Sequence, residues 1–145
     1  MVTARDIVGR SVVQADTGKV LGRVHEVLLD GQGSQVVALQ IAPTSWFSAA
    51  RAVPWEQVQS LGPDQVLATG EPVELPALGR EARNLGQLAE RSSYAAAEEA
   101  TLDDVVFEPD SGRVLGYRLS GGFLQDLLDG RSFLPAGQID LSGDL

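Results

Sequence analysis

The chain has 145 residues, of which 43% are hydrophobic and 21% are charged, a globular composition that argues against disorder. Its net charge of −9 comes from 20 acidic and 11 basic residues without a basic stripe, which disfavours direct binding to nucleic acid or to an anionic membrane. Cysteine is absent, so disulfides, thiolate catalysis and Cys-ligated zinc are excluded.

The sequence carries no sign of export or membrane insertion. Residues 1–13 lack the apolar core of a signal peptide, and no apolar run approaches the roughly 20 residues that a membrane-spanning helix needs. We therefore expect a cytoplasmic protein without a transmembrane segment.

The first half of the chain predicts short strands joined by glycine-containing turns. In chain order we expect strands over residues 7–13, 19–29, 36–41, 52–54 and 65–69, turns at 16–18 and 30–33, a loop at 43–50 and one helical turn within 55–60. Gly31 and Gly33 tolerate the positive φ that a hairpin turn needs. The proline-containing segment 71–79 is expected to be a linker.

The second half begins with a segment that gives two conflicting predictions. Residues 80–100 are rich in Ala, Glu, Leu and Arg, which favours a helix, whereas alignment with the first half predicts strands. We expect a strand near Ala100 and a helix or loop before about Leu88. The later elements expected are strands over 101–107 and 113–120, a turn at 108–112, a helical turn at 123–128 and an extended segment at 132–135.

One pattern occurs twice in the chain. In each copy an apolar run ends on an acid, Asp30 or Glu108, and a glycine-containing turn and a second apolar run follow. After a loop, each copy ends in a short proline tail, Val53-Pro54-Trp55-Glu56-Gln57-Val58 or Leu134-Pro135-Ala136-Gly137-Gln138-Ile139. The spacing predicts two similar β units. Because units of about 70 residues have thin cores, we expect the two to pack on each other.

These motifs resemble the PRC-barrel family. The family opens with V/I-G-x-x-V, here Val8-Gly9-Arg10-Ser11-Val12, and continues with D-x-G-x-x-L-G-x-V-x-D/E-V-L-x-D, here Asp16 through Asp30. A valine-rich strand and an apolar-proline tail close the pattern. The first copy matches over residues 5–69 and the second over 102–139. The second copy has residues 96–100 in place of the G-x-x-L-G element.

The resemblance implies a mainly β fold: two small antiparallel PRC-like β-barrels in tandem, packed on each other, with short helical turns. The expected organisation is a first barrel at residues 1–70, a linker at 71–84 and a second barrel, degenerate in its N-terminal part, at 85–145.

The resemblance also implies a role. In characterised members the barrel is a protein-binding or assembly module, as in a ribosome maturation factor that docks on a ribosomal protein and in the photosynthetic reaction-centre H subunit. No catalytic residue belongs to the family pattern. We expect a non-enzymatic binding or assembly module that needs no cofactor and has a protein partner or self-associates, for example as a homodimer. The alternative is an accessory factor in ribosome maturation or in photosynthetic or other membrane-complex assembly.

Two equivalent loops supply the candidate partner-binding residues. These are Trp46, Phe47, Phe123 and Leu124, and each pair precedes an arginine and the proline tail of its copy. Exposed aromatic side chains are good anchors for a partner. The alternative is that they fold back over the barrel ends and add to thin cores.

Polar residues predict no catalytic, cofactor or metal site. His25 is the single histidine and has no sequence partner for catalysis or metal binding, so we expect it on a strand surface. The acids Asp103, Asp104, Glu108 and Asp110 surround the second hairpin, but their spacing does not match a calcium loop. Strand alternation places Asp103 and Asp104 on opposite faces, which favours a solvated edge.

Overall fold

The computed structural model describes residues 1–42, 50–79, 82–85, 87, 101–120 and 133–135, which form a mainly β structure with two sheets and few helical turns. The larger sheet has the order β6 (Val58–Leu61), β7 (Gln65–Ala68), β2 (Ser11–Gln14), β3 (Val20–Leu29), β4 (Val36–Ile41), β5 (Arg51–Pro54) and β8 (Val73–Glu74). The smaller has the order β1 (Val2–Thr3), β9 (Thr101–Phe107), β10 (Val114–Ser120) and β11 (Phe133–Pro135).

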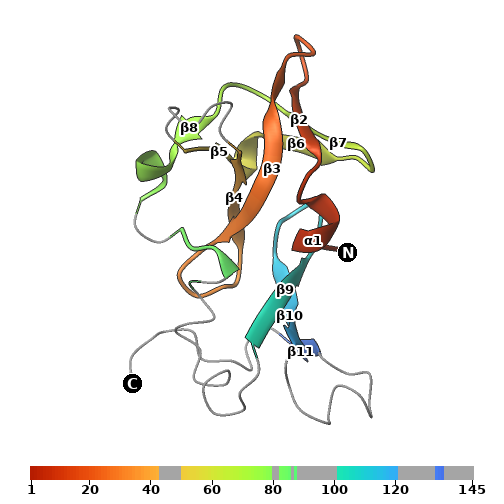
Figure 1. Ribbon diagram of the computed structural model, residues 1–145, viewed down its shortest axis with the longest axis vertical. Helices are drawn as coiled ribbons and strands as arrows, with labels where there is room; N and C mark the ends of the chain where they lie inside the picture. The colour runs from red at the N-terminus through yellow and green to blue at the C-terminus, as the bar shows by residue number, and fades with distance from the viewer. Residues whose placement is uncertain (43–49, 80–81, 86, 88–100, 121–132, 136–145) are drawn as a thin grey trace.

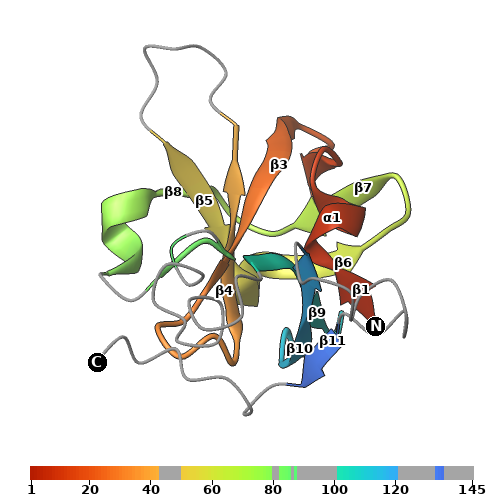
Figure 2. The same ribbon diagram turned by 60° about the horizontal axis from the view of Figure 1, so that its bottom comes forward.

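Strand β3 is the long central element of the larger sheet (Figure 1). It pairs antiparallel with β2 on one side and with β4 on the other. The β2–β7 pair is the parallel one in this sheet. Figure 2 shows β4, β5 and β8 to one side of β3, while β9, β10 and β11 lie together beneath it. Neither sheet closes into a barrel within the described ranges, so the expected closed barrels are not seen there.

Most of the predicted strands are present, but the first one was placed wrongly. The segment predicted as a strand over 7–13 contains the end of a short helix, α1 (Ala4–Ile7), and β2 begins only at Ser11. A capping box starts α1: the Thr3 N–H donates to Asp6 Oδ2 at 3.0 Å, and the Asp6 N–H donates to Thr3 Oγ1 at 3.2 Å. This satisfies amides that a helix start leaves unpaired, which favours a helix here over a strand.

The segment expected as a linker contains regular structure. Strand β8 pairs with β5 through Arg51 and Glu74, and a 3₁₀ turn, η2 (Leu75–Leu78), follows it. The expected helical turn after β5 is a second 3₁₀ turn, η1 (Trp55–Gln57), which leads directly into β6. Strand β8 within this segment therefore extends the larger sheet.

The three-stranded unit β9–β10–β11 repeats the pairing of β3–β4–β5. Glu26 pairs with Gln40 in the first unit, and Asp104 pairs with Arg118 in the second, a shift of 78 positions on both strands. All five residue pairs of the β3–β4 ladder recur at this shift. The proline tails also pair with equivalent residues of the neighbouring strand. Pro54 faces Ala38 in the first unit, and Pro135 faces Gly116 in the second.

The N-terminal end of each unit pairs with the other unit. Strand β1 pairs with β9, where Val2 faces Phe107. Reciprocally, Arg83 bridges Leu29 at the end of β3, through N–H to carbonyl distances of 2.7 and 2.8 Å. Leu29 and Phe107 are equivalent in the repeat. The two units thus exchange their leading segments.

A second capping pair extends this equivalence. The Asn84 N–H donates to Gln87 Oε1, and the Gln87 N–H donates to Asn84 Oδ1, both at 2.8 Å. These bonds have the same pattern as the Thr3–Asp6 capping box. Asn84 directly follows the bridging residue Arg83, as Thr3 directly follows Val2. The structure therefore aligns Thr3 with Asn84.

The hairpin turns of the two units also meet. Gln35 bridges Arg113, its own equivalent in the repeat, with the Val36 N–H on the Gly112 carbonyl at 2.8 Å and the Val114 N–H on the Ser34 carbonyl at 3.0 Å. One buried cluster contains apolar residues of both sheets, including Leu29, Val36, Leu39, Val53, Phe107 and Tyr117. The two sheets therefore contribute side chains to one buried cluster.

Candidate functional site

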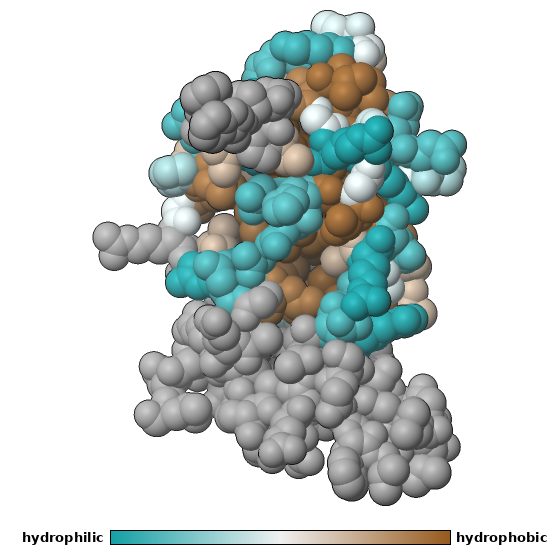
Figure 3. Space-filling view, viewed as in Figure 1, coloured by the Kyte–Doolittle hydropathy of each residue, from teal (hydrophilic) through white to brown (hydrophobic). Residues whose placement is uncertain are grey.

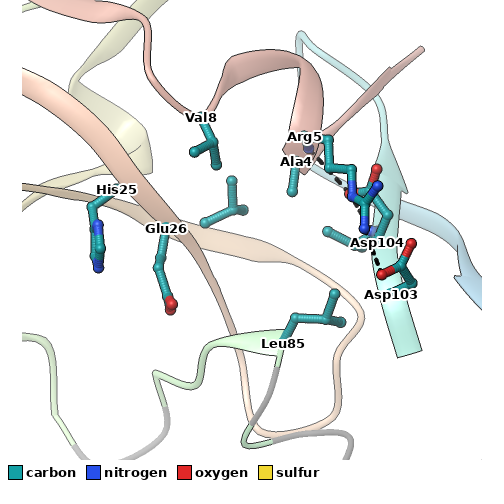
Figure 4. A pocket seen from close by; sticks show the side chains of 10 residues that line it. Ala4, Arg5, Val8, His25, Glu26, Leu85, Asp103 and Asp104 are labelled. Carbon is teal, nitrogen blue, oxygen red and sulfur yellow. Dashed lines mark hydrogen bonds and ion pairs between the residues drawn. The ribbon is translucent and has the colours of Figure 1, made fainter. Parts of the chain in front are cut away.

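A pocket of about 170 Å³ lies between β3, α1 and β9, on the face shown in Figure 3, where apolar side chains run between polar ones. We call it the seam pocket, lined by Ala4, Arg5, Val8, His25, Glu26, Val27, Leu85, Asp103, Asp104 and Val105. In Figure 4, Glu26 and His25 approach from β3, Arg5, Asp103 and Asp104 from the opposite side, Val8 lies above and Leu85 below.

The seam pocket is built from repeat-equivalent residues. Three pairs come from the central strands: His25 with Asp103, Glu26 with Asp104, and Val27 with Val105. Ala4 and Leu85 form a fourth pair, because each follows the N-cap of its capping box. The pocket therefore lies where an approximate two-fold relation between the units brings equivalent positions together.

A β-bulge interrupts the central strand of each unit beside the pocket. His25 has no partner in the pairing of β3 with β4, and Asp103 has none in the pairing of β9 with β10. The two residues occupy equivalent positions of the repeat. A bulge leaves one residue unpaired and interrupts the alternation of faces. The bulge at Asp103 interrupts the regular alternation on which the prediction of opposite faces for Asp103 and Asp104 was based, and both residues line the seam pocket.

Asp104 is the best-satisfied acid of the pocket. Its residue is 2% exposed, and its Oδ1 accepts the Arg5 N–H at 3.1 Å and the Val105 N–H at 2.8 Å. Its neighbour Asp103 forms an exposed ion pair with Arg5, at 2.5 Å between Oδ1 and Nη2. Together these contacts hold α1 of the first unit against β9 of the second, and they neutralise the Arg5 guanidinium.

Glu26 has no such partner. Its Oε2 atom is fully buried, and no hydrogen-bond donor among the described residues reaches it. A buried acceptor left unpaired costs about 1–3 kcal/mol, and more when it is charged. Glu26 occupies the position that Asp104 has in the second unit. The pocket therefore combines apolar side chains with the Glu26 carboxylate, for whose Oε2 the described residues supply no donor.

This arrangement is suited to recognition of a small group. Ligand pockets for drug-sized molecules have volumes of roughly 300–1,000 Å³, and the seam pocket is smaller. In the described part of the chain, no group of three or more His, Asp or Glu residues could hold a metal ion. His25 lies at the pocket edge with its side chain exposed, in line with the predicted strand-surface position.

The predicted partner-binding residues Trp46, Phe47, Phe123 and Leu124 lie outside the described residues. Sequence reasoning did not select Glu26. A signal was available, since an acid occurs at the same repeat position in both units, Glu26 and Asp104, with an aspartate or histidine before it. A separate signal indicates the start of α1, because Thr3-Ala4-Arg5-Asp6 has the spacing of a capping box.

Comparison with known proteins covers the first unit. Residues 1–74, about half of the chain, match the family model described as PRC-barrel domain, and no second copy is detected. A search of curated proteins gave no match. Within the described ranges, no helix has the length and apolar character needed to cross a membrane.

Proposed function

Since this chain belongs to the PRC-barrel domain family, we propose that it works as a non-enzymatic protein-binding or assembly module. The observation that carries this proposal is the seam pocket, which combines apolar and acidic side chains and whose Glu26 carboxylate has a buried oxygen without a donor among the described residues. Such a pocket can bind a group of the opposite charge on a partner surface. The net charge of −9 adds long-range attraction for a basic protein.

The second unit is proposed to be a degenerate PRC-like copy, so that the chain is a tandem of two related units. The supporting observation is that the β3–β4–β5 pairing recurs in β9–β10–β11, including both bulges. A module of this kind presents two related surfaces in a fixed relation, which suits the assembly of a complex.

Of the two processes considered, ribosome maturation is favoured by charge. Ribosomal proteins are basic, and an acidic module finds a basic partner through complementary potentials. A net charge of −9 is a poor match for the anionic surface of a membrane, which disfavours a role at membrane complexes. We propose a cytoplasmic location on the same grounds.

The proposal is tested by affinity capture from a lysate of the source cells, followed by reconstitution with the purified partner. We expect a stoichiometric complex with a basic protein that weakens as salt concentration rises, because exposed charges are screened beyond about 10 Å at 0.1 M salt. Light scattering of the pure chain, run in parallel, measures self-association. A chain that is monomeric and captures no stoichiometric protein at low salt would overturn the proposal.

A further inference from the structure

We infer that the seam pocket receives a lysine side chain from the basic partner. This inference rests on the proposed protein-binding function and specifies the group that is recognised. It is carried by four properties of the pocket: its size, its apolar walls, the distribution of its charges and the unpaired Glu26 oxygen.

The size and walls fit a single long side chain. A volume of about 170 Å³ is too small for a nucleotide or an organic cofactor. Ala4, Val8, Val27, Leu85 and Val105 supply apolar contacts along the pocket. A lysine buries its four-carbon stem along such a surface and carries its charge only at the tip.

The charges select a cation. Among the residues that line the pocket, Arg5 is the one that carries a positive charge at all relevant pH values. The ion pair with Asp103 already neutralises this charge. Asp104 and Glu26 then leave the pocket with an excess of negative charge. An anionic group would be repelled by both carboxylates, whereas an ammonium group is attracted to them.

The Glu26 carboxylate gives the ammonium group a specific partner. Asp104 Oδ1 is already occupied by the N–H groups of Arg5 and Val105. Glu26 Oε2 has no donor among the described residues, and a charge-assisted hydrogen bond to a buried carboxylate is stronger than one between neutral groups. The compact ammonium group can donate to it without the room that a planar guanidinium needs.

The experiment is a titration of the full-length ¹⁵N-labelled chain with a blocked glycine pentapeptide that has lysine at its centre. The matched probe has norleucine there, which keeps the aliphatic stem and lacks the ammonium group. We expect saturable amide shifts at His25, Glu26 and Val27 and at Asp104 and Val105 with the lysine peptide. We expect at least tenfold weaker binding of the norleucine peptide.

Two isosteric variants separate a specific contact from general charge. Glu26→Gln removes the charge of the unpaired oxygen, and Glu71→Gln removes the same charge from an exposed residue that does not line the pocket. Glu26→Gln should weaken the lysine peptide at least tenfold, and Glu71→Gln by less than twofold. Thermal unfolding of both variants checks that they are folded.

Three outcomes would overturn the inference. These are equal binding of the lysine and norleucine peptides, equal weakening by Glu26→Gln and Glu71→Gln, and shifts that do not involve the pocket. If the full chain still forms its stoichiometric complex in any of these cases, the lysine site fails and the proposed function stands. If no protein partner exists, the proposed function itself fails.

Discussion

Glu26 and Asp104 occupy the same position in the two units but have different surroundings. The shorter Asp104 side chain accepts two backbone N–H groups and holds α1 in place. Glu26 is longer by one methylene group, and its Oε2 has no donor among the described residues. The two acids at this repeat position thus differ: Asp104 has a structural role, and Glu26 has the binding role that we propose.

The structural role of Asp104 predicts a large loss on truncation. Asp104→Ala removes the acceptor of both the Arg5 and the Val105 N–H and should lower the free energy of unfolding by about 3 kcal/mol. Asp104→Asn keeps an oxygen acceptor and should cost about 1 kcal/mol. Urea unfolding measures both. As a control, Asp103→Ala removes only an exposed ion pair, so its cost should stay below about 1 kcal/mol; a cost equal to that of Asp104→Ala would contradict the assigned roles.

Tyr117 predicts a loss of stability at alkaline pH. Its side chain is buried, its hydroxyl donates to the Gly33 carbonyl, and burial, followed by the charge of Asp30, raises its pKa above the ordinary value. Because the folded state holds this proton more tightly than the unfolded state does, the contribution to stability is complete below about pH 10 and falls above it, by up to about 1.4 kcal/mol per pH unit.

The Tyr117→Phe variant lacks this titration. At neutral pH it should be less stable than the native chain by about 1–2 kcal/mol, because the Gly33 carbonyl loses its donor. Above about pH 10 the difference between the two proteins should shrink. Urea unfolding over this pH range measures it, and a difference that stays constant would show that the Tyr117 hydroxyl titrates normally.

At the scale of elements, the contact between the two hairpin turns is the most constrained point. Gly112 has φ +75°, and its carbonyl accepts the Val36 N–H across the turns. A Cβ atom there would lie 2.7 Å from Gln35 Nε2 and 2.7 Å from Trp55 Nε1. The Gln35 amide can move aside, but the Trp55 ring packs edge-on against Phe107 at a centroid distance of 5.9 Å. A side chain at Gly112 would therefore disturb the core.

Gly18 provides a matched control for this position. It has φ +74° and no atom within 4 Å of an added Cβ, so Gly18→Ala should cost only the backbone strain, about 1–2 kcal/mol. Gly112→Ala should cost about 2 kcal/mol more, because the new methyl group overpacks the Trp55 contact. Chemical denaturation of the two variants measures the difference. Equal costs would show that the turns are not packed tightly against each other.

At the scale of the whole molecule, the units share one core and exchange their leading segments. Val2 pairs with Phe107, Arg83 bridges Leu29, and the side chains of Leu29 and Phe107 belong to the same buried cluster. Neither unit can lose its structure without exposing apolar surface of the other. The two should therefore unfold together.

Phe107→Ala tests this coupling. Phe107 is fully buried in the second unit and packs against Trp55 of the first, so the truncation should cost about 3–5 kcal/mol. In a Trp46→Phe background, Trp55 is the single tryptophan and its fluorescence reports on the first unit. The fluorescence and circular dichroism transitions should coincide and should shift together in the variant. Two separate transitions would mean that the units are independent domains.

Most elements could be predicted from the sequence because their signals are local. The apolar run that ends at Asp30, the glycine turn at Gly33 and the β-branched return strand identify the first hairpin, and the same pattern at Glu108 identifies the second. The predicted strand before Ser11 was wrong because the capping interaction of Thr3 and Asp6 overrides the apolar pattern that follows it.

The sequence by itself determined most of the strands, the repeated hairpin pattern and the family, since periodicity, turn residues and motif spacing are local properties of the chain. The tertiary structure alone decided the exchange of leading segments, the contact of Gln35 with Arg113 and the seam pocket. The first two depend on main-chain hydrogen bonds between distant residues, which residues of almost any type can make. A bulge at His25 likewise leaves no mark in the composition of β3, yet it brings that residue and Glu26 to the same pocket.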